Sequence, residues 1–555
     1  MNAHFRRDEC KNWSCPLPFR DGRPELQNNY FQVLKRANIL NRSLQKDEVK
    51  RRHFIDFMNS MLSNGHAEKA PPLQEGEEGW FLPIFGVYHH RTKDKVRVVF
   101  DSAAKYGGVS LKDVLLSGPD LTNSLLGIII RFRREQVTAI ADIQQMFYCF
   151  KVNEEHRNYL RFFWHEDNNI DKPLIEYRMC VHIFGNTASP AIATYGLRLS
   201  ASHSTLGSDV TDFVMNYFYV DDGLTSQPTV NAAVDLIERT QKVLKSEGNI
   251  KLHKIASNHK EVMQAFPSED LSNDLVNLEL GNQSLPVQHS LGVRWSLESD
   301  AFLFNITSRD QPYSRRGVLS TINSIFDPLG FLAPVVIEGK LLLRKLISSN
   351  NDWDQPLPPE HFNNWNQWTT SLSNLQQFQI PRTYLSSSFA QSKDKSVHIF
   401  CDASEKAIAA VAYIRARNNS GGKELGFILG KSNVAPVHGH TIPRLELCSA
   451  VLSTQIAETI AHHLQLPICE FKYYTDSKVI LGYINNESRR FFNYVTNRVQ
   501  KIRSCTHPQQ WHYVHTDSNP ADKGTRTLPA SKISDSTWIK GPAYLLEGDR
   551  KQIQV

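Results

Sequence analysis

Three aspartates in the first half of the chain have the types and spacing of a magnesium site. Asp142 ends the strand-like run TAIADI, and Asp221 and Asp222 follow about eighty residues later in YFYVDDGL, which has the form of a hairpin. Two carboxylates at a tight turn that face a third on a neighbouring strand offer hard oxygen ligands to Mg²⁺. Nucleotidyl transfer needs such a site, because one ion lowers the pKa of the attacking hydroxyl and another steadies the pyrophosphate leaving group. Asp-Asp-Gly is also a good turn sequence, so YVDD alone is more often a solvated hairpin tip.

Four further carboxylates lie in the second half of the chain. They are Asp402, Glu446, Asp476 and Asp522, which are 44, 30 and 46 residues apart. A set of this kind binds two Mg²⁺ ions, one of which activates a water molecule while the other stabilises the departing 3′-oxygen of an RNA strand. Four acids among 57 mean nothing individually. They can converge only if the fold brings the ends of several strands together.

The elements that must position the first set are strands and helices before residue 250. WFLPIFGVYH and KVRVVFD are rich in β-branched and aromatic residues, which predicts strands. Residues 230–247 are typical of an amphipathic helix, with Thr229 as its N-cap and Gly248 as its C-cap. Apolar spacing within residues 1–70 predicts two helices, the second of which ends at Gly65.

A second α/β pattern would position the other four carboxylates. Strands are expected at VHIFCDAS, AAVAYIR and FKYYTDSK, and helices are expected near residues 445–463 and 493–503. The polar segment from about Leu385 to Ser396 is the best candidate for a linker before this pattern.

The order of motifs in the first half resembles the fingers and palm of reverse transcriptases. VRVVFDSAAK, ADIQQMFYCFKV, FGNTASPAIA, FYVDDGL and LGVRW follow one another between Trp80 and Trp295. DSAAKYGGVSLKDVLLSGPDL and RRGVLSTINSIFDPLGFLAPV are similar to the variants of the Pao/BEL group of long-terminal-repeat retrotransposons. The resemblance implies a right-hand polymerase in which Asp142 and Asp221 bridge the metals and Asp222 completes the site.

The same resemblance implies contacts to the incoming nucleotide. Phe147 lies where these polymerases place an aromatic steric gate, which would clash with a ribose 2′-hydroxyl. Arg97 matches the fingers arginine that grips the triphosphate, assisted by Lys93 or Lys95. Without the resemblance, Phe147 is an ordinary aromatic residue and the charges are the polar face of a strand.

Three further segments complete the comparison with reverse transcriptases. Gly185 and Ser189-Pro190 match the turn that lets template and nucleotide approach the backbone, and Leu291 to Trp295 resembles the primer grip. Retroviral enzymes usually carry Gln directly before the glycine, where this chain has Phe184.

Residues 396–528 resemble ribonuclease H. His515, seven residues before Asp522 and four after Trp511, matches that family's mobile histidine, which helps to protonate the leaving group or to release product. Without the resemblance, a lone loop histidine is more often a bystander. A polymerase and a nuclease in one chain would serve a single task, the conversion of RNA into double-stranded DNA, because the RNA template must be removed before a second DNA strand is made.

Composition and charge describe an ordinary globular protein. The chain of 555 residues is 41% apolar and carries a net charge of +6, which suits a polyanionic partner without requiring one. The eight cysteines contain no C-x-x-C pair, which argues against a zinc ribbon. Candidate phosphate contacts, for which a solvated charged face is the alternative, are Arg131, Arg133, Arg134, Arg315, Arg316, Arg489, Arg490 and Arg498.

These observations predict an α/β (α+β) protein with five segments. They are a helical lead-in (1–75), reverse transcriptase fingers and palm (76–290), a thumb or connection-like region (291–390), a ribonuclease H-like domain (395–530) and a tail (531–555). The expected function is RNA-directed DNA polymerase with RNase H activity, as the central portion of a retrotransposon Pol. The alternative is a non-catalytic relic or co-opted protein that binds nucleic acid through the same fold.

The expected cofactor is Mg²⁺ or Mn²⁺, with two ions in each active site. The expected partners are an RNA template, a DNA primer, the RNA/DNA hybrid, dNTPs and other Pol or Gag products, with a dimer left open and no membrane. The lack of a signal peptide predicts an intracellular protein, and the resemblance implies a cytoplasmic retrotransposon particle, with the nucleus as the alternative.

Overall fold

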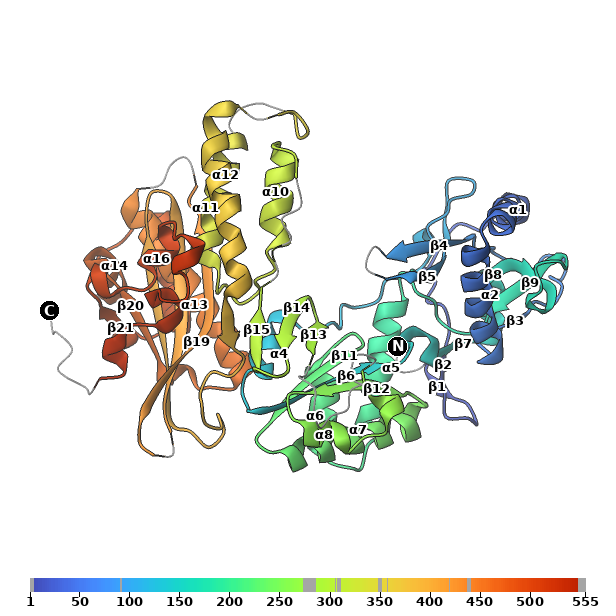
Figure 1. Cartoon of the computed structure of the whole chain (residues 1–555), viewed down its shortest axis with the longest axis horizontal. Helices are drawn as coiled ribbons and strands as arrows, with labels where there is room; N and C mark the ends of the chain where they lie inside the picture. The colour runs from blue at the N-terminus through green and yellow to red at the C-terminus, as the bar shows by residue number, and fades with distance from the viewer. Residues whose placement is uncertain are drawn as a thin grey trace. The chain divides into compact units, whose positions relative to one another are not determined.

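The structure is a computed structural model, and it describes residues 4–89, 92–272, 286–304, 306, 311–347, 352–356, 358–418, 420–436 and 441–547. The chain divides into two compact units. The first comprises Met1–Asn123, Ala141–Gly223 and Asp235–His253, and the second comprises Ser124–Ile140, Leu224–Val234 and Lys254–Val555. Both mix helices with sheets (Figure 1), which confirms the predicted α/β (α+β) class. No helix of the described chain is long and apolar enough to cross a bilayer.

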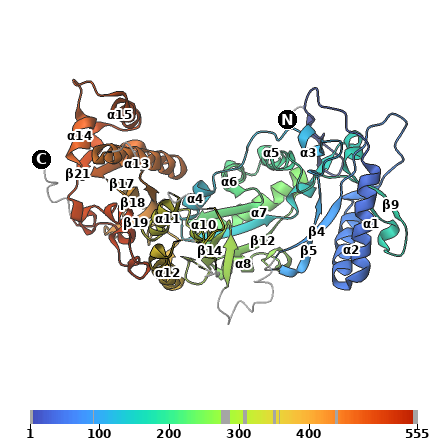
Figure 2. The ribbon, with the colours of Figure 1, turned by 90° about the horizontal axis from the view of Figure 1, so that it is seen from above.

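The first unit is built around two helices and several small sheets. Its main elements are α1 (Tyr30–Lys46), α2 (Glu48–Ser63), β3 (Ala67–Lys69), β4 (Ile84–His89), β5 (Thr92–Phe100), α3 (Leu111–Val114), β8 (Arg161–His165), β9 (Leu174–Met179), α5 (Ser189–Ser202) and α6 (Ser208–Asn216). Helices α1 and α2 pack side by side (Figure 2), and Phe54 of α2 shares a core with Trp80 and Phe100. The two helices predicted from apolar spacing are therefore present, and Gly65, with a φ of 67°, follows the end of α2.

The first fifteen residues differ from the predicted helical lead-in. β1 (Arg6–Arg7) pairs with β2 (Trp13–Cys15), and β2 runs parallel to β7 (Phe150–Val152). Trp13 and Cys15 are buried while Ser14 between them is partly exposed, which is the alternation of a strand. The alternating pattern of this strand is too short to be recognised in the local sequence. The strand is also stabilised by a partner, β7, that lies more than a hundred residues away in the chain.

A four-stranded sheet, in the order β10-β11-β6-β12, carries the first carboxylate set. Its strands are β6 (Val137–Ile143), β10 (Phe218–Tyr219), β11 (Asp222–Gln227) and β12 (Leu252–Ser257), and its residues are divided between the two units. After β11 comes α7 (Val230–Gly248), where the Thr229 hydroxyl accepts a hydrogen bond from the Ala232 amide at 3.2 Å, as predicted for the N-cap. The left-handed residue after α7 is Asn249, with a φ of 49°, rather than the predicted Gly248.

The second unit contains a small antiparallel sheet, in the order β13-β14-β15-β16, and a group of helices. The strands are β13 (Val287–Ser290), β14 (Val293–Ser296), β15 (Ala301–Leu303) and β16 (Gln379–Pro381). The helices outside the larger sheet are α4 (Leu125–Phe132), α8 (Lys260–Gln264), α10 (Arg315–Ser324), α11 (Ala333–Ile347) and α12 (Phe362–Ser371). α10, α11 and α12 pack side by side (Figure 1), and α11 also lies against the larger sheet.

The larger sheet carries the second carboxylate set and has the order β19-β18-β17-β20-β21. Its strands are β17 (Lys393–Ala403), β18 (Ala407–Arg417), β19 (Lys423–Val434), β20 (Phe471–Thr475) and β21 (Trp511–Tyr513). The first three run antiparallel, and β17, β20 and β21 run parallel. The accompanying helices are α13 (Ile442–Leu464), α14 (Lys478–Asn485), α15 (Asn493–Cys505), α16 (Asp522–Thr525) and α17 (Thr537–Lys540). β17, β18, β20, α13 and α15 are the elements that the sequence predicts.

The predicted linker from Leu385 to Ser396 is wrong. Leu385, Phe389 and Ser392 are buried, and β17 already begins at Lys393. A serine-rich composition is typical of an exposed linker, but in this segment hydroxyl and main-chain amide groups donate hydrogen bonds inside the fold. The Ser388 hydroxyl and the Ala390 amide both donate to the buried Glu135 carboxylate, at 2.6 and 2.8 Å.

Candidate active sites

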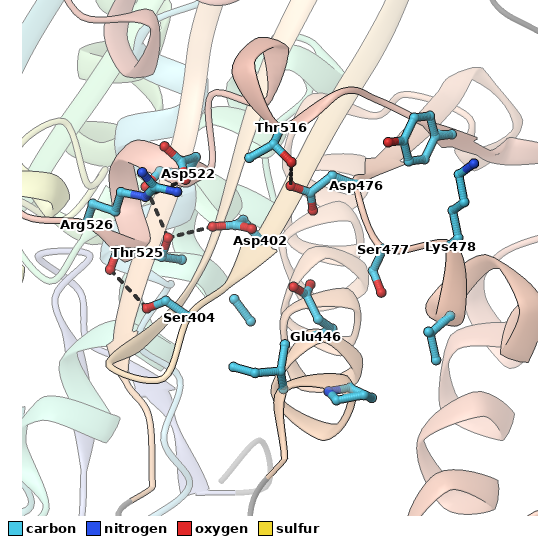
Figure 3. Close-up of a pocket in the computed structure, with 15 residues that line it drawn as sticks. Asp402, Ser404, Glu446, Asp476, Ser477, Lys478, Thr516, Asp522, Thr525 and Arg526 are labelled. Atoms are coloured by element: carbon cyan, nitrogen blue, oxygen red, sulfur yellow. Dashed lines mark hydrogen bonds and ion pairs between the residues drawn. The ribbon is translucent and has the colours of Figure 1, made fainter.

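Three of the four carboxylates in the second set converge at one edge of the larger sheet. Asp402 lies near the end of β17, Asp476 follows the end of β20, and Glu446 lies in the second turn of α13. Parallel pairing of β17 with β20 brings their ends together, and α13 lies against β17. One carboxylate oxygen from each residue lies within 4.8 Å of the others (Figure 3), which is a spacing suited to a shared cation.

Burial gives these carboxyls unusual proton affinities. Burial, and then the neighbouring Asp476 and Asp522, raises the pKa of Asp402 to about 7. Burial, and then Asp402 and Asp476, raises the pKa of Glu446 to about 9. The Oε2 atom of Glu446 is buried with no hydrogen-bond partner among the described residues. A divalent cation would satisfy this oxygen and relieve the mutual repulsion, so the donor set fits Mg²⁺ or Mn²⁺.

Asp522 lines the same cavity but lies outside this close cluster. The Arg526 guanidinium, one turn further along the chain, forms an ion pair with the Asp522 carboxylate at 2.8 Å. Thr525 lies between these two residues in the sequence, and its hydroxyl donates a hydrogen bond to Asp402 Oδ2 at 2.5 Å (Figure 3). Sequence analysis singles out neither Thr525 nor Arg526. Thr525 and Arg526 lie three and four residues after Asp522. Residues at this spacing share a helix face, so the spacing could have indicated them.

The cavity around the cluster has a volume of about 530 Å³ and is open on one side. Lys478, Tyr513, Thr516 and Ile442 are among the residues that line it. The Thr516 hydroxyl donates to Asp476 Oδ2 at 2.8 Å and so orients a second member of the cluster.

His515, the predicted mobile histidine, does not point into this cavity. Its side chain is largely exposed and does not line the cavity, and its Nδ1 atom lies 3.4 Å from the Asp517 carboxylate. The neighbouring Thr516 contacts the cluster instead. The role assigned to His515 by resemblance therefore stays a prediction.

The first carboxylate set lies on β6, on β11 and in the turn before β11. Asp142 is on β6, and the Ile143 amide beside it donates to the Asp221 carbonyl at 2.9 Å. Asp142 Oδ1 also accepts a hydrogen bond from His253 Nε2 of β12 at 3.2 Å. Among the described residues, Asp142, Asp221 and Asp222 do not form a close ligand cluster like that of Asp402. His253 is a contact that the sequence does not signal, because it lies 111 residues from Asp142.

The predicted hairpin at YVDD is present, with a different turn. Phe218 pairs with Gly223 and Tyr219 pairs with Asp222, so the two turn residues are Val220 and Asp221. Val220 has a φ of 57°, which a β-branched residue rarely adopts. Asp222 and Gly223 therefore belong to the strand β11 rather than to the turn.

Aromatic residues and an arginine stack beside this sheet. The Phe147 and Phe184 ring centroids lie 5.7 Å apart, and the Arg97 guanidinium lies 5.6 Å from the Phe184 ring centroid. Phe184, which departs from the retroviral pattern, thus connects the two predicted nucleotide contacts, and its side chain is 52% exposed. Gly185 follows with a φ of 101°, where any side chain would be strained. The side chains of Lys93 and Lys95 lie outside the described residues.

The segment that resembles a primer grip is a tight hairpin. Ser290 of β13 pairs with Val293 of β14, and the two turn residues, Leu291 and Gly292, have φ values of 53° and 80°. Positive φ at both positions matches the twist of the strands in a two-residue hairpin. Trp295 of β14 is buried.

The candidate phosphate contacts fall into two groups. Arg489 and Arg490 are exposed, as phosphate binding requires. Arg131 and Arg133 are buried, and Arg131 Nη1 lies 2.7 Å from His463 Nδ1 of α13. The prediction is therefore wrong for Arg133, which is 2% exposed and binds main-chain carbonyls of its own unit.

Comparison with solved structures shows the fold. At a TM-score of 0.51 and 16% identity, 82% of this chain matches 67% of a foamy viral protease-reverse transcriptase solved with double-stranded DNA. At a TM-score of 0.52 and 15% identity, 95% of this chain matches a foamy viral protease-reverse transcriptase solved with an RNA/DNA hybrid, and this chain spans 59% of the length of that protein. No curated protein sequence matches the chain.

One family matches part of the sequence directly. Residues 314–477 match the family described as Pao retrotransposon-like RNaseH-like domain. The match begins at α10, includes Asp402 and Glu446 and ends just after Asp476, so it covers three of the four carboxylates described above. This match agrees with the resemblance to the Pao group, and the fold of the chain is similar to that of the foamy viral protease-reverse transcriptases.

Proposed function

We propose that the chain is an RNA-directed DNA polymerase with RNase H activity and acts as a segment of a retrotransposon Pol. The convergence of Asp402, Glu446 and Asp476 within 4.8 Å is the observation that carries the nuclease half. These residues come from three elements far apart in the sequence, and their charges repel one another. Such a buried cluster lowers stability unless it serves to bind a cation.

The polymerase half rests on weaker geometry. Asp142 lies on β6 and Asp221 lies in the turn before the adjoining strand β11, and Phe184 contacts both Phe147 and Arg97. Both halves would act on a nucleic acid duplex, and the solved proteins of similar fold were bound to double-stranded DNA and to an RNA/DNA hybrid. Deoxynucleoside triphosphates, an RNA template and a DNA primer are the substrates that this proposal assigns.

In the nuclease half, this chain's residues would hold and orient the reacting groups. Asp402, Glu446 and Asp476 would bind the divalent cation, which when bound lowers the pKa of the attacking water and neutralises charge on the phosphate. Thr525 and Thr516 fix the rotamers of Asp402 and Asp476 through their hydroxyls. Lys478 also lines the cavity, where its positive charge would favour the approach of a phosphodiester.

In the polymerase half, the side chains would position the nucleotide. His253 Nε2 contacts Asp142 Oδ1 at 3.2 Å and would orient this carboxylate. Arg97 provides positive charge for a triphosphate, and its stacking on Phe184 limits its rotamers. The Phe147 ring would exclude the ribose 2′-hydroxyl by steric contact.

Two single substitutions separate the activities. Purified wild-type protein, Asp221→Asn and Asp402→Asn are each given a DNA primer on an RNA template, dNTPs and Mg²⁺. We expect Asp221→Asn to lose primer extension and keep RNA cleavage, while Asp402→Asn does the reverse. Each variant is thus the control for the other's folding.

Three outcomes distinguish the alternatives. Loss of both activities in one variant, with native thermal unfolding, would contradict two separate centres. Cleavage without extension in the wild-type protein would indicate a nuclease only. A folded protein that binds the hybrid and has neither activity would support a non-catalytic relic or a co-opted nucleic-acid-binding protein.

A further inference from the structure

A second cavity of the second unit lies beside β19, at the edge of the larger sheet. It has a volume of about 300 Å³, and it is lined by α10, by α11, by the turn between these two helices and by β19 (Figure 1). The polar side chains that line it are those of Asn323, Asp327, Lys340, Lys431 and Asn433. The sequence motifs assign none of these five residues a role.

Lys340 of α11 brings a half-buried positive charge into this cavity. Its ammonium donates to the Ser432 carbonyl of β19 at 3.4 Å, which is a long hydrogen bond. Burial lowers the pKa of Lys340, and the negative charge of Asp327 opposes this shift. An ammonium has three N–H donors, and among the described residues this bond uses one of them. The side chain can therefore bind an anion in the cavity.

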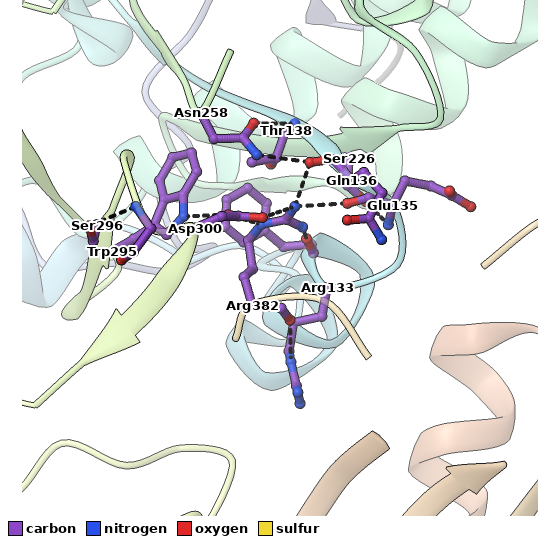
Figure 4. Close-up of polar contacts among 12 residues, drawn as sticks. Arg133, Glu135, Gln136, Thr138, Ser226, Asn258, Trp295, Ser296, Asp300 and Arg382 are labelled. Carbon is purple, nitrogen blue, oxygen red and sulfur yellow. Dashed lines mark hydrogen bonds and ion pairs between the residues drawn. The ribbon is translucent and has the colours of Figure 1, made fainter. Parts of the chain in front are cut away.

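Arg382 shows how internal contacts satisfy another buried cation of the same unit. Its Nε and Nη2 atoms donate to the two carboxylate oxygens of Asp300, at 2.7 and 2.8 Å (Figure 4). The same guanidinium also donates to three main-chain carbonyls, those of Phe132, Glu135 and Gln136. Lys340 has no comparable set of partners in the part of the chain that the structure describes. Internal contacts therefore do not account for its charge.

Asp327, the acidic side chain in the lining, is already occupied. Its Oδ1 atom accepts a hydrogen bond from the Phe331 amide at 3.0 Å, and its Oδ2 atom accepts one from the Leu332 amide at 2.6 Å. These bonds use the carboxylate to hold the turn before α11. Lys431 of β19 is exposed and adds a second positive charge to the lining. The cavity is therefore suited to an anion rather than to a metal ion.

Helix α16 lies between this cavity and the carboxylate cluster. Arg526, at the end of α16, lines the cavity around the cluster. A Cβ on Gly524 of the same helix would lie 2.8 Å from the hydroxyl oxygen of Ser432, a residue that lines the smaller cavity. Strand pairing places Asp402 opposite Ala409, and Ala409 opposite Ser432. Ser432 is thus two strand spacings, about 10 Å, from Asp402.

We propose that the cavity beside β19 binds a backbone phosphate of the RNA strand through Lys340 and Lys431, close to the phosphate that is cut. This inference rests on the proposed function, in which the carboxylate cluster acts on an RNA phosphate. The neighbouring phosphates of the same strand are then the nearest anions of the substrate, and Arg526 provides positive charge between the two cavities. Such a contact adds affinity and fixes the register of the strand without reading its bases.

The first test measures the affinity for an RNA/DNA hybrid at several salt concentrations, without a divalent cation so that no RNA is cut. We expect Lys340→Met and Lys431→Met each to weaken binding and to reduce the slope of log K against log salt by about one. Lys393→Met is the matched control, because Lys393 is exposed at the opposite end of β17 from Asp402. It should keep the wild-type slope.

The second test identifies the phosphate that is bound. One phosphate at a time, in either strand, is replaced by an uncharged methylphosphonate, carried on a 2′-deoxy residue where the strand is RNA. The same residue with an ordinary phosphate is the control. We expect one RNA position beside the cut site where the replacement weakens binding by the wild-type protein but not by Lys431→Met. Such non-additivity shows that the lysine and that phosphate are in contact.

The outcomes separate this proposal from the nuclease function. If the wild-type protein cuts RNA but folded Lys431→Met keeps the wild-type affinity and slope, the phosphate site is wrong and the nuclease function stands. Because Lys431 is exposed, this variant remains informative even if Lys340→Met does not fold. If the wild-type protein cuts no hybrid, the nuclease function fails and the phosphate site with it.

Two further outcomes would contradict the choice of ligand. If the phosphate coupled to Lys431 belongs to the DNA strand, the assignment to RNA is wrong. Inorganic phosphate is also added to the wild-type protein and to Lys340→Met during thermal unfolding. If it stabilises only the wild-type protein while hybrid binding does not depend on either lysine, the cavity binds a free anion and the assignment to RNA is again wrong.

Discussion

In the carboxylate cluster of the larger sheet, the Thr525 hydroxyl orients Asp402. Both residues are buried, and the hydroxyl donates to Asp402 Oδ2 at 2.5 Å. A bond to a carboxylate in such a site contributes about 1.5–3 kcal/mol. We expect Thr525→Val to reduce RNA cleavage about tenfold or more, with primer extension unchanged. Thr525→Ser, which keeps the hydroxyl, should restore most of the cleavage rate, and equal loss in both variants would contradict this role.

His253 is expected to have the corresponding role beside Asp142. The Nε2–Oδ1 contact of 3.2 Å joins β12 to β6, and both side chains are mostly shielded from solvent. His253→Leu should lower the rate constant of primer extension more than it changes the KM for dNTP, because it disturbs the carboxylate rather than the nucleotide pocket. RNA cleavage by the same preparation serves as the control. A variant with unchanged extension would show that the contact is incidental.

The clustered carboxylates were predictable from the sequence, and the residues that contact them were not. Strand-like runs end near Asp402 and Asp476, and a helical run begins near Glu446. Such runs can be recognised in the sequence alone. Arg133 shows the limit, because its partner carbonyl at Ile428 lies 295 residues away. Nothing near Arg133 in the sequence distinguishes a buried structural arginine from an exposed phosphate contact.

At the scale of single elements, β17 contains a histidine that makes stability depend on pH. Burial, and then the positive charges of Arg415 and Lys472, lowers the pKa of His398 to about 3. The unfolded chain has an ordinary histidine pKa of about 6.5, so the unfolded state binds more protons between these values. The stabilising contribution of neutral His398 is therefore present above about pH 6.5 and is lost as the pH falls towards about 3.

This pH dependence can be measured by denaturant unfolding from about pH 7 to about pH 4.5. In the wild-type protein, the free energy of unfolding should fall with a slope of up to about 1.4 kcal/mol per pH unit from this histidine. His398→Gln, which can still contact Ser396 and Tyr474, should have a shallower slope. Equal slopes would mean that His398 does not titrate as its burial indicates.

The turn before α11 depends on a glycine. Gly330 has a φ of 74°, and a Cβ at this position would lie 1.8 Å from the Gly430 carbonyl oxygen of β19. Gly330→Ala should lower the free energy of unfolding by about 2 kcal/mol or more, because both strain and a backbone clash oppose it. Gly482→Ala is the matched control, since a Cβ on that helical glycine meets nothing within 4 Å and should stabilise α14 slightly. A neutral Gly330→Ala would contradict the close packing of this turn on β19.

At the scale of the whole molecule, the larger sheet is completed by segments outside the predicted 395–530 domain. The Trp538 indole is fully buried and donates to the Gly330 carbonyl at 3.0 Å. Ile337 and Leu341 of α11 pack against Ala407 of β18. The matched family segment also begins at residue 314, before β17.

Fragments of the chain test how far this domain extends. We expect residues 311–547 to unfold cooperatively at a higher temperature than residues 393–530, which lack both α11 and Trp538. Residues 393–547 should fall between them, because they regain only Trp538. Far-ultraviolet circular dichroism against temperature provides the measurement. Equal midpoints for the three fragments would show that β17 to α16 form an independent domain, as the sequence pattern alone suggests.

The bond between Trp538 and the Gly330 carbonyl also has a consequence for synthesis of the chain. The two residues are 208 positions apart, so the seam between α11 and β19 is covered by Trp538 only after most of the remaining chain has been translated. Until then, the aromatic rings of Phe331 and Phe427, which pack 4.8 Å apart at this seam, lack part of their cover. Nascent chains that pause after β19 would expose an apolar strand to other unfolded chains. The rate of elongation past this point, rather than final stability, would then determine how much protein reaches the native state.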